Sequence, residues 1–125
     1  MYEISVEHRF RASHYLRGYH GKDESPHEHD WRAEIRFRGK NLAQPEGYLL
    51  DFAEVQGLLK KIVSVMDGKS INGIRPFDKL NPSAENIARW VYTEFARLSA
   101  HKPARVTIWE KDGNSAGYIP DDPKN

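Results

Sequence analysis

The stretch HEHDWRAEIRFRG, residues 27–39, decides the fold. Apolar and charged side chains alternate along it, which is the period of a β-strand with one buried face. His27 and His29 share the parity of the apolar side chains Trp31, Ala33, Ile35 and Phe37. We therefore predict a strand over 27–39 whose buried face begins with two neighbouring imidazoles.

A second alternating stretch, residues 2–14, supplies a third histidine. His14 has the apolar parity of this stretch and lies at its C-terminal end. If the two strands form an antiparallel hairpin through residues 15–26, the end of the first meets the start of the second. His14, His27 and His29 then converge, and three imidazoles with a fourth position left open are a common zinc site.

The alternative for each histidine is an ordinary core or surface residue, because a single His-x-His pair is weak evidence for a metal. His8 has the apolar parity, but it lies about 20 Å from His14 along the strand at about 3.3 Å per residue. We interpret His8 as a packed side chain. His20 and His101 fall in predicted loops and receive no role.

Length and composition indicate a single domain, 1–125, without strong attraction to nucleic acid or membrane. The chain is 38% hydrophobic and 30% charged, with a net charge of +1 and no cysteine. Disulfides, thiolate ligands and a thiol nucleophile are thereby excluded, and a reducing cytoplasm is the expected location. We find no secretory signal pattern and no apolar run near the ~18 residues that a membrane helix needs.

The rest of the chain predicts two helices and two further strands. Asp51 looks like an N-cap with Glu54 as its capping-box partner, so a helix is expected over 52–66, ended by Asp67-Gly68. A second helix is expected from Asn81-Pro82, with proline at the first helical position. The remaining predictions are irregular chain over 68–81, a strand from Arg105 to Glu110, a short strand over 117–119 and a frayed end at 121–125. The order is ββααββ, an α+β domain with two helices on one face of an antiparallel sheet.

Glu110 is an anomaly because it has the parity of the apolar Val106 and Ile108. A lone carboxylate on a buried face is costly. Either the strand frays and Glu110 is solvated, or the carboxylate accepts two adjacent N–H groups, as from a guanidinium or a 2-amino-pyrimidinone ring.

The opposite face of the first two strands carries Arg9, Arg11, Arg32, Glu34, Arg36 and Arg38. This face is interpreted as solvated. A nucleic-acid patch and the wet interior of an oligomeric barrel are the alternatives, the latter because pairing between subunits hides sheet edges.

Five stretches together resemble the 6-pyruvoyl-tetrahydropterin synthase and 6-carboxy-tetrahydropterin synthase family. They are FRASH at 10–14, HEHDW at 27–31, GYLLDF at 47–52, NPSAEN at 81–86 and VTIWE at 106–110. The resemblance implies a tunnelling fold in which subunits assemble around an axis, so a homo-oligomer, a trimer or a hexamer, is expected.

The same resemblance implies a set of site residues and a substrate. Zinc would be held by His14, His27 and His29, and a pterin ring by Glu110, with help from Ser83 and Glu85 near a subunit interface. The implied substrate is 7,8-dihydroneopterin triphosphate or a near relative. Zinc would act as a Lewis acid on its side-chain hydroxyls.

The chain departs from the family at its catalytic residues. Typical members carry a cysteine shortly before the first histidine of the pair, where this chain reads Asp23-Glu24-Ser25-Pro26. Some relatives instead have a glutamate, in an arrangement that Glu24-Ser-Pro-His27 resembles, and they are associated with forming a 6-hydroxymethyl-pterin. We therefore predict Glu24 or Asp23 as the general base, with Asp67 assisting. Gly68 stands where the family has a histidine after that aspartate.

Three functions are compatible with these residues. The first is a zinc-dependent lyase that eliminates or cleaves the dihydroneopterin side chain, in queuosine or folate biosynthesis. The second is a degenerate homologue that binds zinc and a pterin with little or no turnover. The third is a non-pterin protein, either a cupin-like metalloenzyme or a nucleic-acid binder. Two helices in mid-chain and too few strands argue against a cupin.

Overall fold

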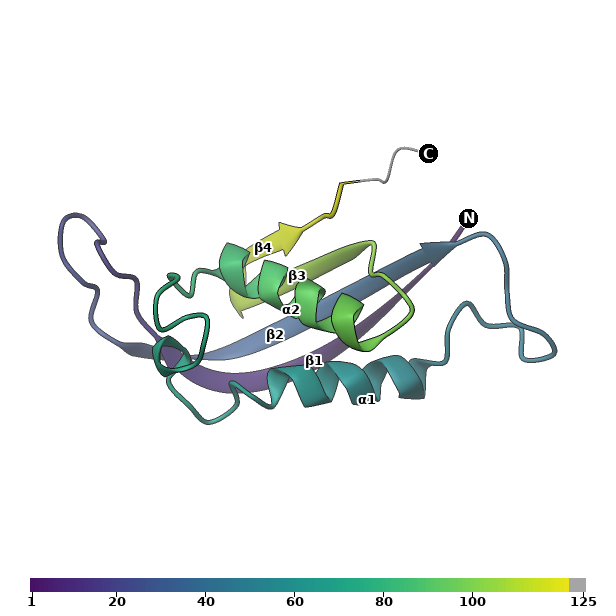
Figure 1. Ribbon diagram of the computed structural model, residues 1–125, viewed down its shortest axis with the longest axis horizontal. Helices are drawn as coiled ribbons and strands as arrows, with labels where there is room; N and C mark the ends of the chain where they lie inside the picture. Colours follow the sequence, from purple (N-terminus) through teal and green to yellow (C-terminus); the bar gives the residue numbers. More distant parts are fainter. Residues whose placement is uncertain (122–125) are drawn as a thin grey trace.

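The computed structural model describes residues 1–121 and has one antiparallel sheet with two helices on one face (Figure 1). The elements are β1 (Tyr2–His14), β2 (His27–Gly39), α1 (Phe52–Val63), η1 (Ile71–Gly73), α2 (Ala84–Leu98), β3 (Arg105–Lys111) and β4 (Asn114–Tyr118). The strands lie in the order β1-β2-β3-β4. The predicted ββααββ architecture is confirmed.

The β1–β2 hairpin has the bounds that alternation predicts. Its register places His14 opposite His27 and Ala12 opposite His29. Side chains of apolar parity are buried or half-buried along most of the hairpin, whereas most of those between them are exposed. The end of β1 and the start of β2 therefore share one edge of the buried face.

The core lies between this face and the helices. α1 packs against β1, and α2 packs against β3 and β4. Trp31, Ala33 and Ile35 of β2 are fully buried. Both helices thus cover the sheet face that carries the three histidines at one of its ends.

The first helix ends earlier than predicted. Asp51 is its N-cap and accepts a hydrogen bond from the Ala53 N–H at 2.9 Å. The helix ends at Val63 rather than at residue 66, because the chain tightens into a turn in which the Met66 N–H donates to the Val63 carbonyl. Met66 remains fully buried, which explains why the apolar period continued past the helix end. A reciprocal capping bond from Glu54 does not occur within residues 1–121.

The second helix begins later than predicted, at Ala84. Ser83 is the N-cap, and its hydroxyl accepts from the Asn86 N–H at 3.1 Å. Pro82 therefore precedes the cap instead of opening the helix. The reason is tertiary, because the Pro82 carbonyl is bound by His14, and the Asn81 side chain is bound to Arg17.

The last strand also differs from its prediction, since β4 spans Asn114–Tyr118 rather than 117–119. Gly113, with φ of +89°, makes the tight turn that joins it to β3. Apart from Asp121, the predicted frayed end at 121–125 lies outside the described residues.

Candidate functional site

The three predicted histidines lie together at one end of the sheet. The imidazole centroids are 4.6 Å apart for His14 and His27, 4.7 Å for His27 and His29, and 5.4 Å for His14 and His29. One potential ligand atom from each histidine and one from Glu110 all lie within 4.8 Å of one another. We call these four residues the histidine cluster.

Backbone carbonyls fix the orientation of two of the imidazoles. The His14 Nδ1–H donates to the Pro82 carbonyl at 2.7 Å, and the His27 Nδ1–H donates to the Ser25 carbonyl at 3.0 Å. Because a carbonyl only accepts, the proton of each neutral ring is on Nδ1 and the Nε2 lone pair is available. A hydrogen bond from the second ring nitrogen to a carbonyl is the usual support of a metal-ligating histidine, because it fixes the tautomer and the ring orientation.

Burial leaves two of the imidazole nitrogens without partners. His14 is 2% exposed, and its Nε2 has no hydrogen-bond partner within residues 1–121. Burial lowers the pKa of His14 and of His29, which favours the neutral form of both rings. Neutral imidazole is the form that binds a metal.

Trp31 forms the apolar wall behind the cluster. Its fully buried ring meets the His14 ring edge-on at 4.7 Å and the His29 ring at 5.5 Å. The indole N–H donates to the Ala12 carbonyl at 3.0 Å, which fixes the ring. Trp31 thereby limits both solvent access and rotation of the imidazoles.

Glu110 resolves the ambiguity of the sequence by facing the histidines. Its Oε1 lies 3.0 Å from His29 Nε2, next to an irregularity of the β3 ladder between Trp109 and Lys111. The two atoms are within ion-pair distance but are not aligned as a hydrogen bond, so His29 Nε2 also lacks a partner among the described residues. Three imidazoles and one carboxylate are a donor set that zinc accepts, and the residues present therefore fit such a metal.

Glu24, but not Asp23, lies against the cluster. Glu24 Oε1 is 3.8 Å from His27 Nδ1 and accepts from the Leu16 N–H at 3.1 Å. Asp23 is exposed and accepts from the Gly18 N–H at 3.2 Å, so it shapes the loop over 15–26.

The remaining predicted residues are not part of the cluster within this chain. The Asp67 carboxylate accepts from the Arg11 N–H at 3.0 Å, about 10 Å before His14 along β1 at about 3.3 Å per residue. Ser83 caps α2, and Glu85 is exposed in the first turn of that helix. Their link to the cluster is the backbone of Pro82.

The structure adds residues that sequence reasoning missed. Asn72 and Asn81 bind the backbone of residues 15 and 17, next to Glu24. The Pro82 carbonyl orients His14. Only the family motif at 81–86 pointed to this segment, and it did not indicate these bonds.

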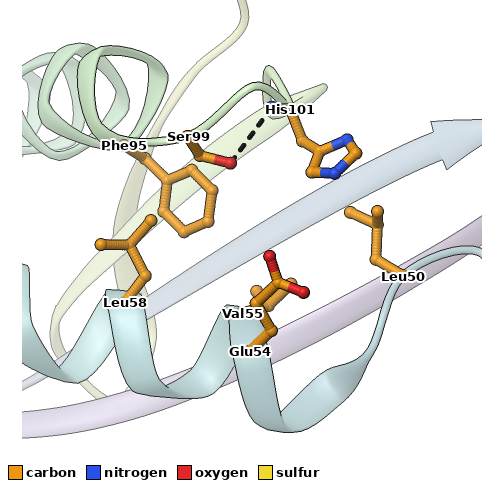
Figure 2. A pocket seen from close by; sticks show the side chains of 7 residues that line it. All are labelled: Leu50, Glu54, Val55, Leu58, Phe95, Ser99 and His101. Carbon is orange, nitrogen blue, oxygen red and sulfur yellow. Dashed lines mark hydrogen bonds between the residues drawn. The ribbon is translucent and has the colours of Figure 1, made fainter.

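A small, partly open pocket between α1 and α2 is a separate feature (Figure 2). Its volume is about 20 Å³, and its lining comprises Leu50, Glu54, Val55, Leu58, Phe95, Ser99 and His101. It lies near Phe37, which contacts Phe95 and is ten positions along β2 from His27. A space of this size holds about one water molecule, so it carries no chemistry of its own.

Comparison with known proteins identifies the family. The family model described as 6-pyruvoyl tetrahydropterin synthase matches residues 3–121. The chain belongs to this family. Membership in this family, with its fold of four strands and two helices, argues against the cupin alternative. No helix in the described part of this family member is long and apolar enough to cross a membrane.

Individual relatives support the same conclusion. A 6-carboxy-5,6,7,8-tetrahydropterin synthase of Haemophilus influenzae is 26% identical, over 94% of this chain and 99% of that protein. The structure of Caenorhabditis elegans 6-pyruvoyl tetrahydropterin synthase has a TM-score of 0.82 at 18% identity, covering 97% of this chain and 98% of that chain. The shared fold of the family is thereby confirmed.

The synthase of Plasmodium vivax is a further structural neighbour. It has a TM-score of 0.76 at 18% identity, covering 96% of this chain and 98% of that chain. Two more structures of that protein, each with a TM-score of 0.73 at 17% identity and the same coverage, carry alanine or cysteine in place of a catalytic glutamate.

Proposed function

We propose that the protein is a zinc-dependent lyase that acts on 7,8-dihydroneopterin or its triphosphate, by elimination or cleavage in the side chain. The observation that carries the proposal is the histidine cluster, in which two buried imidazole nitrogens have no partner and a carboxylate lies alongside. Membership in a family of pterin-processing lyases supports the substrate class.

Zinc, when bound, supplies a Lewis acid that polarises a substrate hydroxyl. His14, His27 and His29 would hold it, because one potential ligand atom of each lies within 4.8 Å of the others. The Trp31 wall keeps water away from this point and so strengthens the electrostatic effect of the metal.

Glu24 is the proposed general base. Its carboxylate is near the cluster and accepts one hydrogen bond, from the Leu16 N–H, so it has further lone pairs for a substrate proton. A catalytic glutamate in the structurally similar Plasmodium vivax protein supports a carboxylate in this role. Asp23 is the weaker candidate, because it is exposed and bound to Gly18.

Glu110 is proposed to anchor the pterin ring, with Ser83 and Glu85 as further substrate contacts. A carboxylate accepts the paired N–H groups of a 2-amino-pyrimidinone ring in a bidentate way. Glu110 Oε1 lies 3.0 Å from His29 Nε2, and this proximity supports a ring-binding role beside the proposed metal.

We also propose a cytoplasmic homo-oligomer, a trimer or a hexamer. Within the described residues, β1 and β4 are the two edge strands, the N-terminal part of β1 pairs only with β2, and the charged face of the sheet is not covered by a helix. Pairing of edges between subunits would satisfy the free backbone groups.

A degenerate homologue that binds but does not turn over is the second candidate. Gly68 follows Asp67, and the Asp67 carboxylate is bound to the Arg11 backbone, so a second proton-transfer group is not at the cluster in this chain. This observation leaves Asp67 with an assisting role only if another subunit brings it to the site.

The experiment is to incubate zinc-loaded protein with 7,8-dihydroneopterin triphosphate, and separately with dihydroneopterin, and to follow products by mass. A 6-hydroxymethyl-, 6-carboxy- or 6-pyruvoyl-pterin supports the lyase and identifies its product class. The Glu24→Gln variant should retain zinc and lose turnover. Intact substrate that co-purifies with the protein supports the degenerate homologue. If the protein neither forms product nor binds the substrate, both candidates are contradicted.

A further inference from the structure

We propose that Asn72 and Asn81 are positioning residues that hold Glu24 against the histidine cluster. The inference rests on the proposed function, in which Glu24 is the base. Neither asparagine belongs to the cluster, and both come from the connection between α1 and α2.

Each asparagine forms a reciprocal pair of hydrogen bonds with one residue of the loop that follows β1. Asn72 accepts from the Tyr15 N–H at 2.9 Å and donates to the Tyr15 carbonyl at 2.9 Å. Asn81 accepts from the Arg17 N–H at 2.9 Å and donates to the Arg17 carbonyl at 3.0 Å. The two amides therefore act as a neighbouring strand would act for residues 15 and 17.

Leu16, between these two residues, makes the opposite pair of bonds. Its N–H donates to Glu24 Oε1 at 3.1 Å, and its carbonyl accepts from the Glu24 N–H at 2.9 Å. In extended chain, successive residues direct their backbone groups to opposite sides. The asparagines thus occupy one side of the segment 15–17, and Glu24 occupies the other.

The connection that provides the asparagines is itself anchored. Asn72 is 7% exposed and lies in η1, while the Asn81 carbonyl accepts from Asn86 Nδ2 at 2.9 Å. The Arg17 guanidinium adds a bond to the Phe77 carbonyl at 2.8 Å. In Figure 1 this connection lies at the same end of the sheet as the loop 15–26. The position of Glu24 is therefore set by chain more than 45 residues away in sequence.

The chemistry of the side chain explains why asparagine suits this task. A primary amide offers an acceptor and a donor on one short side chain, which both groups of a peptide unit require. Aspartate keeps the acceptor but loses the donor. A misplacement of about 1 Å costs a catalytic group on the order of 100-fold in rate, so loosening of residues 15–17 should be visible in turnover.

The test uses the full-length zinc-loaded protein with Asn72→Ala and Asn81→Ala, and Gln56→Ala as a matched control. Gln56 Nε2 also donates to a β1 carbonyl, that of Glu7, at 2.7 Å, but far from the cluster. Hydrogen exchange by NMR should show at least 10-fold less protection of the Leu16 and Glu24 amides in both asparagine variants. The control should leave these two amides unchanged. If Asn81→Ala does not fold, Asn81→Asp is used in its place, because aspartate can still accept the bond from the Arg17 N–H.

Turnover of dihydroneopterin triphosphate gives the second readout. Each asparagine variant should lower kcat by about 10-fold or more, with KM and zinc content within about twofold of the wild type. In the Glu24→Gln background the same substitutions should cause no further loss, because groups that act as a unit are not additive.

Unchanged protection of Leu16 and Glu24, or an equal loss of kcat in the Glu24→Gln background, would overturn the inference. Full turnover by Glu24→Gln itself would instead refute Glu24 as the base. In that case, the exchange measurement still decides whether the asparagines position the loop.

Discussion

At the scale of single residues, His14 shows how a buried polar side chain can be prepared for a ligand. One ring nitrogen is bound to the Pro82 carbonyl, and the other is buried without a partner. A buried nitrogen of this kind is costly in the absence of a ligand. A metal ion bound to this nitrogen would remove that cost, so metal binding is favoured by the burial of His14.

Removal of one imidazole should abolish stoichiometric zinc binding. We expect His27→Ala to purify with less than one tenth of the wild-type zinc, since only two imidazoles of the cluster remain. Metal content by atomic emission is the measurement, and His20→Ala in the exposed loop is the control. Full zinc in His27→Ala would show that the metal is held elsewhere.

Glu110 should matter more for the pterin than for the metal. Glu110→Gln leaves the three imidazoles in place, so zinc should stay bound. Loss of a charge-assisted bidentate contact should weaken pterin binding by about 10-fold or more. Titration of a dihydropterin by fluorescence tests this, and an unchanged affinity would mean that the carboxylate does not contact the ring.

Trp31 should be a large contributor to stability. Trp31→Ala removes a fully buried ring and the bond to the Ala12 carbonyl, so we expect a loss of about 3–5 kcal/mol in the free energy of unfolding. Trp31→Phe should lose less, because most of the packing remains. Urea denaturation of the metal-free proteins separates this effect from zinc binding.

At the scale of elements, the two long strands β1 and β2 were predicted better than the helix ends or the short strand β4. Strict alternation with charged side chains set the bounds of β1 and β2, and the register of one hairpin then determined the meeting of the histidines. The start of α2 could not be predicted in this way. Pro82 and Asn81 are hydrogen-bonded to His14 and Arg17, which are more than 60 residues away, so no local sequence pattern indicates these bonds.

For the candidate site too, features set by strand alternation could be predicted, whereas features set by distant contacts could not. The convergence of His14, His27 and His29 could be predicted because the three share one face and one end of a hairpin. The parity of Glu110 left open whether its carboxylate is solvated or bound, and its place beside His29 is known only from the structure. The asparagine bonds to residues 15 and 17 depend on tertiary structure alone, so the sequence carried no signal for them.

The N-cap of α1 gives a prediction at this scale. The Asp51 carboxylate accepts from the Ala53 N–H, and its charge is placed at the helix N-terminus. Asp51→Ala should lower the free energy of unfolding by about 1 kcal/mol, whereas Asp51→Ser should be close to the wild type. Chemical denaturation is the measurement, and equal losses in both variants would contradict the capping role.

At the scale of the whole molecule, the cluster joins the hairpin to β3. Because the three histidines come from β1 and β2 and converge only when these strands pair, metal bound to them should stabilise the folded chain and not the unfolded one. Free zinc at about 100 times its Kd should add about 2.7 kcal/mol to the free energy of unfolding. Thermal scans with and without a chelator test this, and His27→Ala should show no shift.

The bond between His14 and the Pro82 carbonyl spans 68 residues. During synthesis all three histidines leave the ribosome well before Pro82 and Glu110, so the early chain has the ligands without their supports. We therefore expect the protein to acquire its metal after translation is nearly complete. A ribosome-stalled chain that ends near residue 80 exposes all three histidines but lacks Pro82, and it should bind zinc at least 10-fold more weakly than the released protein, on the scale of losing the groups that orient metal ligands. Equal affinity would show that the hairpin alone recruits the ion.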